Sequence, residues 1–197
     1  MKNLTQKLNN DLKASLDAKK TLLKSSKKIG IAIKKIVSNL KTGGKIMLCG
    51  NGGSAADAQH LAAEFLVRLR PNFNRSPLPA LTLATDTSTI TACGNDYKFS
   101  EIFSRNLEAL GKKNDILIVI STSGNSKNII EVLKKAKRLK IFSIGFLGNS
   151  GGKAKSLCNL PIIIESKNTA RIQEAHIFLG HFVMLNVEGL LFKKKDK

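Results

Sequence analysis

Apolar side chains recur at three- and four-residue intervals along the first 42 positions. The first set is Leu4, Leu8, Leu12 and Leu16, and the second is Ile29, Ile33, Ile36, Val37 and Leu40. Residues three or four apart lie on the same face of an α-helix. The pattern therefore predicts two amphipathic helices before any strand.

Five short apolar segments follow and change the period of the pattern. They span residues 45–50, 80–84, 115–121, 141–147 and 160–165. Apolar segments of this length, separated by helical stretches, are typical of strands that are buried on both faces of a parallel sheet. A long helix is expected over 169–192. The predicted fold class is α/β, a doubly wound parallel sheet flanked by helices.

The chain is expected to form a single domain. Its 197 residues are 42% hydrophobic, which is enough for a sizeable core, and no Pro/Gly/Ser-rich linker or repeat divides it. Within this domain, residues 1–42 supply the N-terminal helices. Residues 43–192 form the α/β core with its closing helix, and 193–197 form a basic tail.

Three features predict a cytoplasmic protein without a membrane partner. No run of about 18 apolar residues is present, and the N-terminus lacks the continuous apolar stretch of a signal peptide. The three cysteines, Cys49, Cys93 and Cys158, are odd in number and have no short paired spacing. Buried, reduced thiols are expected rather than disulfides or a Cys-based zinc finger.

The formal net charge of +19 raises the question of nucleic acid. The lysines are spread over nearly every expected helix, and the aromatic residues are nine Phe and one Tyr. Basic and aromatic residues do not interleave as they do where bases stack. We therefore expect solvated basic faces that attract anionic substrates, and no nucleic-acid partner.

A glycine-rich turn follows the first expected strand. From Leu48 the sequence is LCGNGGSAADAQHLAAEF, in which Asn51, Gly52 and Gly53 lead into a helix. Backbone N–H groups at such a helix start suit a phosphate or another anionic oxygen. His60 and Glu64, four residues apart, share one face of that helix.

A second anion-binding motif follows the third expected strand. The sequence STSGNSKNIIE places the hydroxyls of Ser121, Thr122, Ser123 and Ser126 at the mouth of a helix. Ordinary helix capping accounts for one or two of these hydroxyls, whereas four within six residues favour a phosphate monoester. No Walker motif is present, so a nucleoside triphosphate is not indicated here.

Four blocks resemble the phosphoheptose isomerases, also called sedoheptulose 7-phosphate isomerases, of the sugar isomerase (SIS) fold. They are CGNGGSAADAQHLAAE, TDTSTITACGNDY, STSGNSKNIIE and NTARIQEAHIFLGH, and the match runs from about residue 1 to 190. The resemblance implies a five-stranded parallel sheet and a Ser/Thr loop that holds a sugar phosphate. The implied substrate-binding residues are Asn51, Gly52, Gly53, Glu64, Asn95, Asp96, Ser121, Thr122, Ser123, Ser126 and Gln173.

The resemblance also implies a reaction. Sedoheptulose 7-phosphate would be converted to D-glycero-D-manno-heptose 7-phosphate, the first step toward ADP- or GDP-heptose precursors. Moving a carbonyl between two carbons requires two acid–base groups. By resemblance these are Glu64, which takes the carbon proton, and His181, which handles an oxygen proton. Taken alone, Glu64 could be a solvated helix carboxylate and His181 a hydrogen-bonded core histidine.

Related enzymes carry zinc on a His, Glu, Gln and His set, and the matching positions are His60, Glu64, Gln173 and His181. The resemblance thus implies one Zn²⁺ per subunit. Eight residues of helix separate Gln173 from His181 by about 12 Å. Either Gln173 sits at a bent helix start, or the site draws on two chains. The unpartnered apolar stripes of the N-terminal helices favour a homo-oligomer, and the resemblance implies a tetramer.

Two residues depart from the family pattern, and a non-enzymatic function is the alternative to an isomerase. Lys98 replaces a glycine common in relatives and is expected at the rim of the sugar site, whereas Val119 replaces a small residue inside a strand. The rival is a non-enzymatic SIS protein that binds a sugar phosphate or a replication-initiation protein. Such relatives tend to lack the residues matching Glu64 and His181, and this chain has both.

Overall fold

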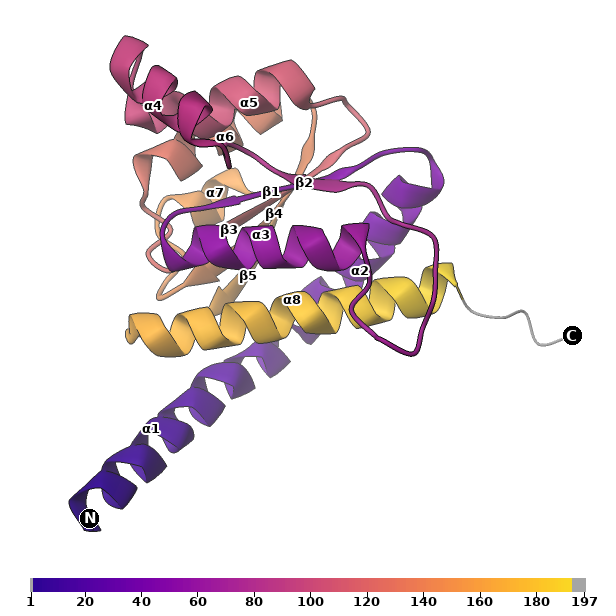
Figure 1. The fold of residues 1–197 in the computed structure, drawn as a ribbon. Helices are drawn as coiled ribbons and strands as arrows, with labels where there is room; N and C mark the ends of the chain where they lie inside the picture. Colours follow the sequence, from indigo (N-terminus) through magenta and orange to yellow (C-terminus); the bar gives the residue numbers. More distant parts are fainter. Residues whose placement is uncertain (1, 193–197) are drawn as a thin grey trace, which may run out of the picture.

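A five-stranded parallel sheet lies at the centre of the computed structural model, which describes residues 2–192 (Figure 1). The strands are β1 (Ile46–Gly50), β2 (Ala80–Thr82), β3 (Ile116–Ser121), β4 (Phe142–Gly148) and β5 (Leu160–Ile164). They lie in the order β2-β1-β3-β4-β5, and every pair is parallel. The predicted fold class is confirmed, and the expected basic tail lies outside the described residues.

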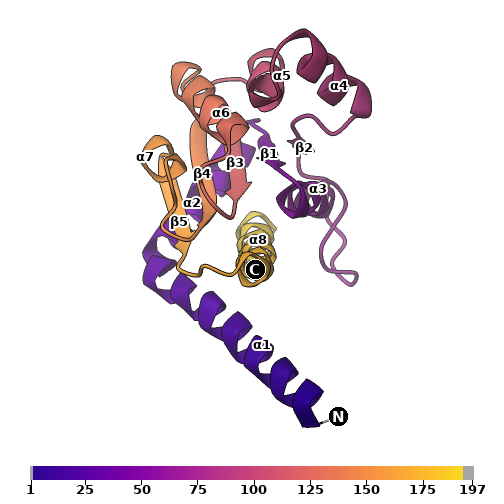
Figure 2. The same cartoon turned by 90° about the vertical axis from the view of Figure 1, so that its left-hand side faces the viewer.

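Helices connect the strands and cover both faces of the sheet (Figure 2). The α-helices are α1 (Lys2–Lys20), α2 (Ser26–Lys41), α3 (Gly53–Leu66), α4 (Thr87–Asp96), α5 (Ile102–Leu110), α6 (Lys127–Arg138), α7 (Ala154–Leu157) and α8 (Thr169–Leu191). Two short 3-10 turns, η1 (Thr21–Ser25) and η2 (Phe99–Glu101), precede α2 and α5. The described part of the chain has no helix with the length and apolarity needed to cross a bilayer.

The core divides into two layers because side chains alternate along each strand. In β3, Ile118 and Ile120 pack with α2, α3 and α8, whereas Leu117 and Val119 pack with α5 and α6 on the other face. Every β3 residue is buried, as expected for a central parallel strand. Val119, expected inside a strand, is completely buried in this layer.

Strand β2 is shorter than the pattern predicts. The apolar segment runs over 80–84, but the strand ends at Thr82. Ala84 has φ +56°, a conformation that turns the chain out of the sheet. Because β2 is the edge strand and pairs only with β1, its apolar sequence continues into the turn without a further strand partner.

Helix α1 projects away from the sheet, and it contacts α8 from its middle onward, where Arg171 of α8 pairs with Asp11 (Figure 1). Its four predicted stripe residues, Leu4, Leu8, Leu12 and Leu16, are between 53% and 71% exposed. The leucine stripe is therefore left uncovered by the described residues of this chain.

The cysteines behave as predicted, since all three are buried and unpaired, and burial raises the pKa of Cys158 to about 12.

His176 of α8 is completely buried on the sheet side of that helix. Neither ring nitrogen has a hydrogen-bond partner of normal geometry, although the ring faces the Leu147 carbonyl. Burial lowers the pKa of His176 to about 4, against 6.5 for an unburied imidazole, and the Leu147 carbonyl opposes the shift. The folded protein therefore holds this imidazole neutral.

This burial predicts a loss of stability in mild acid. Between pH 6.5 and 4 the unfolded chain binds a proton at His176 that the folded chain does not, so the free energy of unfolding falls as pH falls, by up to about 3 kcal/mol. His176→Met should flatten this slope. Urea unfolding of both proteins across this range checks it, and parallel slopes would contradict it.

Candidate active site

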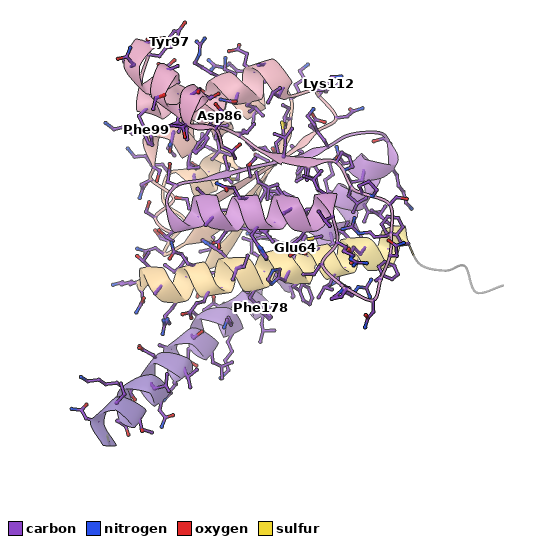
Figure 3. The ribbon with its side chains drawn as sticks, viewed as in Figure 1. Glu64, Asp86, Tyr97, Phe99, Lys112 and Phe178 are labelled. Atoms are coloured by element: carbon purple, nitrogen blue, oxygen red, sulfur yellow. The ribbon has the colours of Figure 1, made fainter. Side chains whose placement is uncertain are left out.

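Three predicted site residues come together where α3 lies along α8. His60 and Glu64 of α3 meet His181 of α8, and Figure 3 shows Glu64 between the two helices. The Nε2 atoms of His60 and His181 are 2.9 Å apart, and His60 Nε2 is 3.6 Å from Glu64 Oε1. The structure thus places the predicted base and its predicted partner in one cluster within one chain.

The two imidazoles share a single proton. At 2.9 Å, one Nε2 must donate and the other accept, so both rings cannot be protonated there. Partial burial lowers the pKa of His181, the neighbouring His60 lowers it further, and Glu64 raises it. A neutral His181 at pH 7 can both accept and release a proton.

Glu64 offers an unused carboxylate oxygen. Its Oε2 is buried without a hydrogen-bond partner, and only 18% of the side chain is exposed. A buried oxygen of this kind costs free energy unless a proton, a metal ion or a ligand engages it. The solvated-carboxylate interpretation of Glu64 therefore does not fit the structure.

Small residues allow α3 and α8 to approach closely. A side chain at Gly180 would come within 2.5 Å of Leu61, and one at Gly53 within 2.4 Å of Gln173 Nε2. The helices run side by side in both views (Figures 1 and 2). Their contacts pair the start of α3 with Gln173 and its middle with His181.

A buried ion pair connects the loop after α3 to α8, next to the C-terminal end of α3. Arg75 and Glu188 have fully buried side chains, and Arg75 Nε lies 2.5 Å from Glu188 Oε1. Arg75 also donates hydrogen bonds to the backbone carbonyls of Glu64 (2.7 Å) and Phe65 (2.9 Å). These bonds satisfy carbonyls that the helix end leaves free, and they hold the backbone of Glu64 in place.

Sequence reasoning missed Asp57, which lies on the same face of α3 as His60 and Glu64. Its Oδ2 is buried without a hydrogen-bond partner. Burial raises the pKa of Asp57, and the adjacent His60 opposes that shift. The signal was available, because positions 53, 57, 60 and 64 follow the helical period.

The predicted phosphate loop connects β3 to the N-terminus of α6. Ser121 Oγ accepts a hydrogen bond from the Gly124 amide, and Ser123 Oγ accepts one from the Asn125 amide, both at 3.1 Å. Ser126 is the N-cap of α6 but makes no capping bond with its side chain. Hydroxyl protons and N–H groups at a helix start are donors that suit a phosphate monoester.

Two contacts fix this loop relative to its neighbours. Asn51 and Asn128 exchange side-chain amide hydrogen bonds of 2.9 and 2.8 Å, which joins the glycine-rich turn to α6. Gly124 has φ +64°, and a side chain there would meet the Gly151 carbonyl oxygen at 2.0 Å. Asn128, whose role no motif signalled, positions a residue predicted to bind substrate.

The predicted zinc ligands are only partly assembled. Residues 2–192 contain no three His, Cys, Asp or Glu side chains already arranged as a metal site. Donor atoms of tetrahedral Zn²⁺ lie roughly 3.4 Å apart. The 2.9 and 3.6 Å separations around His60 Nε2 are close to this value, so His60, Glu64 and His181 fit the ion chemically.

Gln173 does not join them within the chain. Helix α8 is one continuous α-helix from Thr169 to Leu191, so Gln173 does not sit at a bent start. Eight residues of helix separate it from His181 by about 12 Å. Its side chain instead lies against Gly53. A bent helix start therefore does not explain the spacing, and a site that draws on two chains stays a prediction.

Asn95 and Asp96 lie at the end of α4, where Asn95 Nδ2 donates a 2.8 Å hydrogen bond to Asp96 Oδ1. Helix α4 packs chiefly on η2 and α5, and both views place it well apart from α8 (Figures 1 and 2). Their predicted contact with the sugar stays a prediction. Lys98 lies just beyond, as the N-terminal flank of η2.

Known proteins resemble this chain in sequence. A family model described as the SIS domain matches residues 10–148. The chain is 48% identical over 187 residues to the phosphoheptose isomerase of Clostridium acetobutylicum, a match that covers 93% of this chain and 94% of the relative. It is 50% identical over 161 residues to that of Aneurinibacillus thermoaerophilus, covering 82% and 80%.

Solved structures give the same result. The phosphoheptose isomerase from Neisseria gonorrhoeae superposes with a TM-score of 0.87 at 38% identity, covering 94% of this chain and 99% of that one. The enzyme from Francisella tularensis gives the same TM-score and identity, with 93% and 97% covered.

Gly124→Ala tests the geometry of the phosphate loop. Alanine at φ +64° is strained, and its side chain would push residues 121–126 away from Gly151. We expect the dissociation constant of a phosphate monoester, measured calorimetrically, to rise at least roughly tenfold, about 1.4 kcal/mol. Gly189→Ala is the matched control, because nothing lies within 4 Å of that position. An equal effect of both variants would contradict the prediction.

Proposed function

Because the chain belongs to the phosphoheptose isomerase family of SIS-domain proteins, we propose that it converts sedoheptulose 7-phosphate to D-glycero-D-manno-heptose 7-phosphate. The observation that carries the proposal is the cluster of Glu64 with two imidazoles in a chain that also carries a serine-rich phosphate loop. Its relatives of that name match nearly the full chain. The chain is an isomerase that acts on a sugar phosphate.

The cluster supplies the two acid–base groups that the reaction needs. Glu64 Oε2 takes a proton from C1 of the ketose and returns it to C2, with an enediol between the two steps. His181 moves a proton from the C1 hydroxyl to the C2 oxygen, so that C1 becomes the aldehyde. Each residue ends the cycle in its starting protonation state.

The surroundings of the two groups suit these roles. Burial leaves Glu64 Oε2 without a competing hydrogen bond, and the lowered pKa of His181 keeps a neutral imidazole available at pH 7. The hydroxyls of Ser121, Thr122, Ser123 and Ser126 would hold the phosphate, far from the bond changes. This separation would fix C1 and C2 beside Glu64.

Zn²⁺ belongs to the proposal, with one ion per subunit. His60, Glu64 and His181 would hold it, and Gln173 of a neighbouring subunit would complete the set. When bound, the ion would supply Lewis-acid polarisation of the substrate carbonyl. Coordination also lowers the basicity of a carboxylate, which sets a limit on how Glu64 can serve as both ligand and base.

The proposed assembly is a homotetramer in the cytoplasm, where phosphorylated sugars occur. The leucine stripe of α1 is exposed, and an apolar groove of about 500 Å³ beside it is lined by Leu16, Leu23, Phe178 and Phe182. Helices from other copies would bury both surfaces. The same packing would bring a second α8 close to His181.

Glu64→Gln and His181→Ala should each lower kcat at least roughly 100-fold, since each removes one proton carrier. Turnover is followed by NMR as aldose formation from sedoheptulose 7-phosphate, with zinc present and with zinc content measured. Glu131→Gln, which removes a carboxylate from the exposed surface of α6, is the control. If either variant stays within a few-fold of the parent, that residue has no part in the mechanism. If the parent itself does not turn over, the sugar-phosphate-binding alternative replaces the proposal.

Subunit mixing tests the shared site. Inactive Gln173→Ala and His181→Ala variants, mixed under conditions that exchange subunits, should regain activity in about a quarter of the sites by random assortment. Glu64→Gln mixed with His181→Ala should regain none, because the structure places these two residues in one chain. An active monomer in sedimentation, or recovery in the second mixture only, would overturn the shared site.

A further inference from the structure

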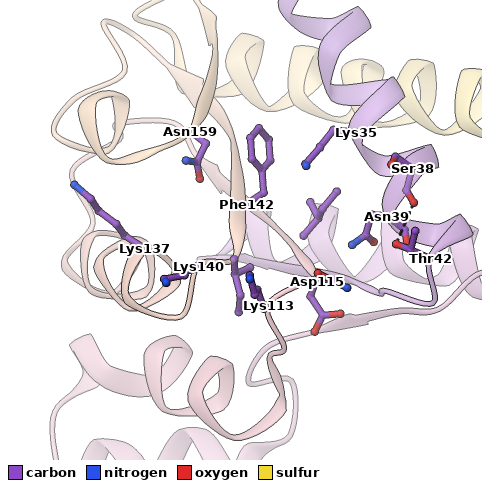
Figure 4. A pocket seen from close by; sticks show the side chains of 13 residues that line it. Lys35, Ser38, Asn39, Thr42, Lys113, Asp115, Lys137, Lys140, Phe142 and Asn159 are labelled. Atoms are coloured by element: carbon purple, nitrogen blue, oxygen red, sulfur yellow. Dashed lines mark hydrogen bonds between the residues drawn. The ribbon is translucent and has the colours of Figure 1, made fainter.

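A basic pocket lies at the amino-terminal edge of the sheet, beside the starts of β3, β4 and β5 (Figure 4). We call it the basal pocket, and its volume is about 460 Å³, within the range of small-molecule sites. Its lining includes Lys35, Asn39, Lys113, Lys137, Lys140 and Phe142. The described strand β3 separates it from the phosphate loop by roughly 17 Å.

The charge of the basal pocket is not neutralised by the protein. None of its four lysines pairs with a carboxylate in residues 2–192. The wall contains one carboxylate, Asp115, which is 3% exposed and already pairs with Lys45 Nζ. The backbone amides of Lys45 and Lys112 also donate hydrogen bonds to Asp115. The four lysines therefore leave uncompensated positive charge in the pocket.

Helix capping explains only part of this arrangement. Lys137 lies in the last turn of α6, where a cation interacts favourably with the helix dipole. Lys35 lies inside α2 and Lys113 in a loop, so neither serves a helix end. Lys140 follows α6 at φ +58°, a position that glycine or asparagine usually occupies. A lysine there keeps a side chain at the pocket despite the strain.

An unsatisfied polar atom of Asn39 points to a ligand. Asn39 is only 7% exposed, and its Oδ1 is buried without a hydrogen-bond partner. Figure 4 shows Asn39 among the side chains that line the pocket. A buried amide oxygen without a donor is costly, and a ligand N–H or O–H would satisfy it.

Phe142 adds an aromatic surface. The ring is half-buried at the start of β4 and lines the pocket, with Lys35 Nζ 5.2 Å from its centroid. An aromatic face beside a cation suits a flat ring whose substituents carry negative charge. A lone phosphate ion would use the lysines but neither Phe142 nor Asn39.

We propose that the basal pocket binds a nucleoside di- or triphosphate. The lysines take the phosphates, Phe142 stacks on the base, and Asn39 Oδ1 accepts a hydrogen bond from an amino or hydroxyl group of the nucleoside. The site is distinct from the isomerase site, because it lies at the opposite edge of the sheet and shares no residue with it.

Fluorescence anisotropy of N-methylanthraniloyl-ATP on the full chain tests this proposal. We expect saturable binding of one probe per chain. The double variant Lys137→Gln/Lys140→Gln should raise the dissociation constant at least roughly tenfold, since it removes two phosphate contacts. The control Lys27→Gln/Lys134→Gln removes the same charge from the surface outside the pocket, on α2 and α6, and should leave binding within about twofold.

Asn39→Ala separates nucleoside recognition from simple anion binding. It should weaken binding of the labelled nucleotide but leave competition by inorganic tripolyphosphate unchanged. The variant removes an unpaired buried oxygen, so thermal unfolding should show no large loss of stability. Equal effects on both competitors, or no effect on either, would contradict a site for a nucleoside.

Three other outcomes would overturn the proposal. Displacement of the probe by excess sedoheptulose 7-phosphate would place it in the isomerase site. Equal weakening by the control pair would show attraction to the overall charge. A single-stranded oligonucleotide that binds the pocket more tightly than the nucleotide would make the surface a nucleic-acid site instead. Retained probe binding under excess sugar phosphate supports a separate pocket.

Discussion

The close contact between α3 and α8 is the constraint on which the candidate active site depends. Gly180 admits Leu61 at a distance that no larger residue would allow, and the buried Arg75–Glu188 pair holds the far end of the contact. Removing one partner of such a pair would leave an uncompensated buried charge, so substitution of either residue should disturb this contact. The cluster of His60, Glu64 and His181 forms where these two helices are in contact.

The loops at the carboxyl ends of the strands depend on a second set of constraints. Paired amides join the turn after β1 to the helix after β3, and a left-handed Gly124 lets the phosphate loop press against Gly151. These contacts are polar or steric, with little apolar burial of their own. They set directions of N–H and O–H groups, whereas the sheet beneath supplies the stability.

The two edges of the sheet carry different chemistry. The carboxyl edge has helix N-termini and the hydroxyls of residues 121–126, and the amino edge has helix C-termini and lysines that pair with no carboxylate in residues 2–192. A parallel sheet produces this polarity by topology, because every connecting helix starts at one edge and ends at the other. Four of the 33 lysine and arginine residues line one pocket at the amino edge.

The amino-acid pattern was enough to predict the fold class, the approximate positions of the five strands and the closing helix, although β2 ends two residues earlier than predicted. These features follow from local periodicity and composition, which act through neighbouring residues. The tertiary structure alone decided that Glu64 and His181 meet, that Gln173 stands apart from them, and that Arg75 reaches α8. Such facts depend on how helices distant in sequence pack, and a side chain such as Asp57 or Asn39 acquires its meaning only from the neighbours that folding brings or fails to bring.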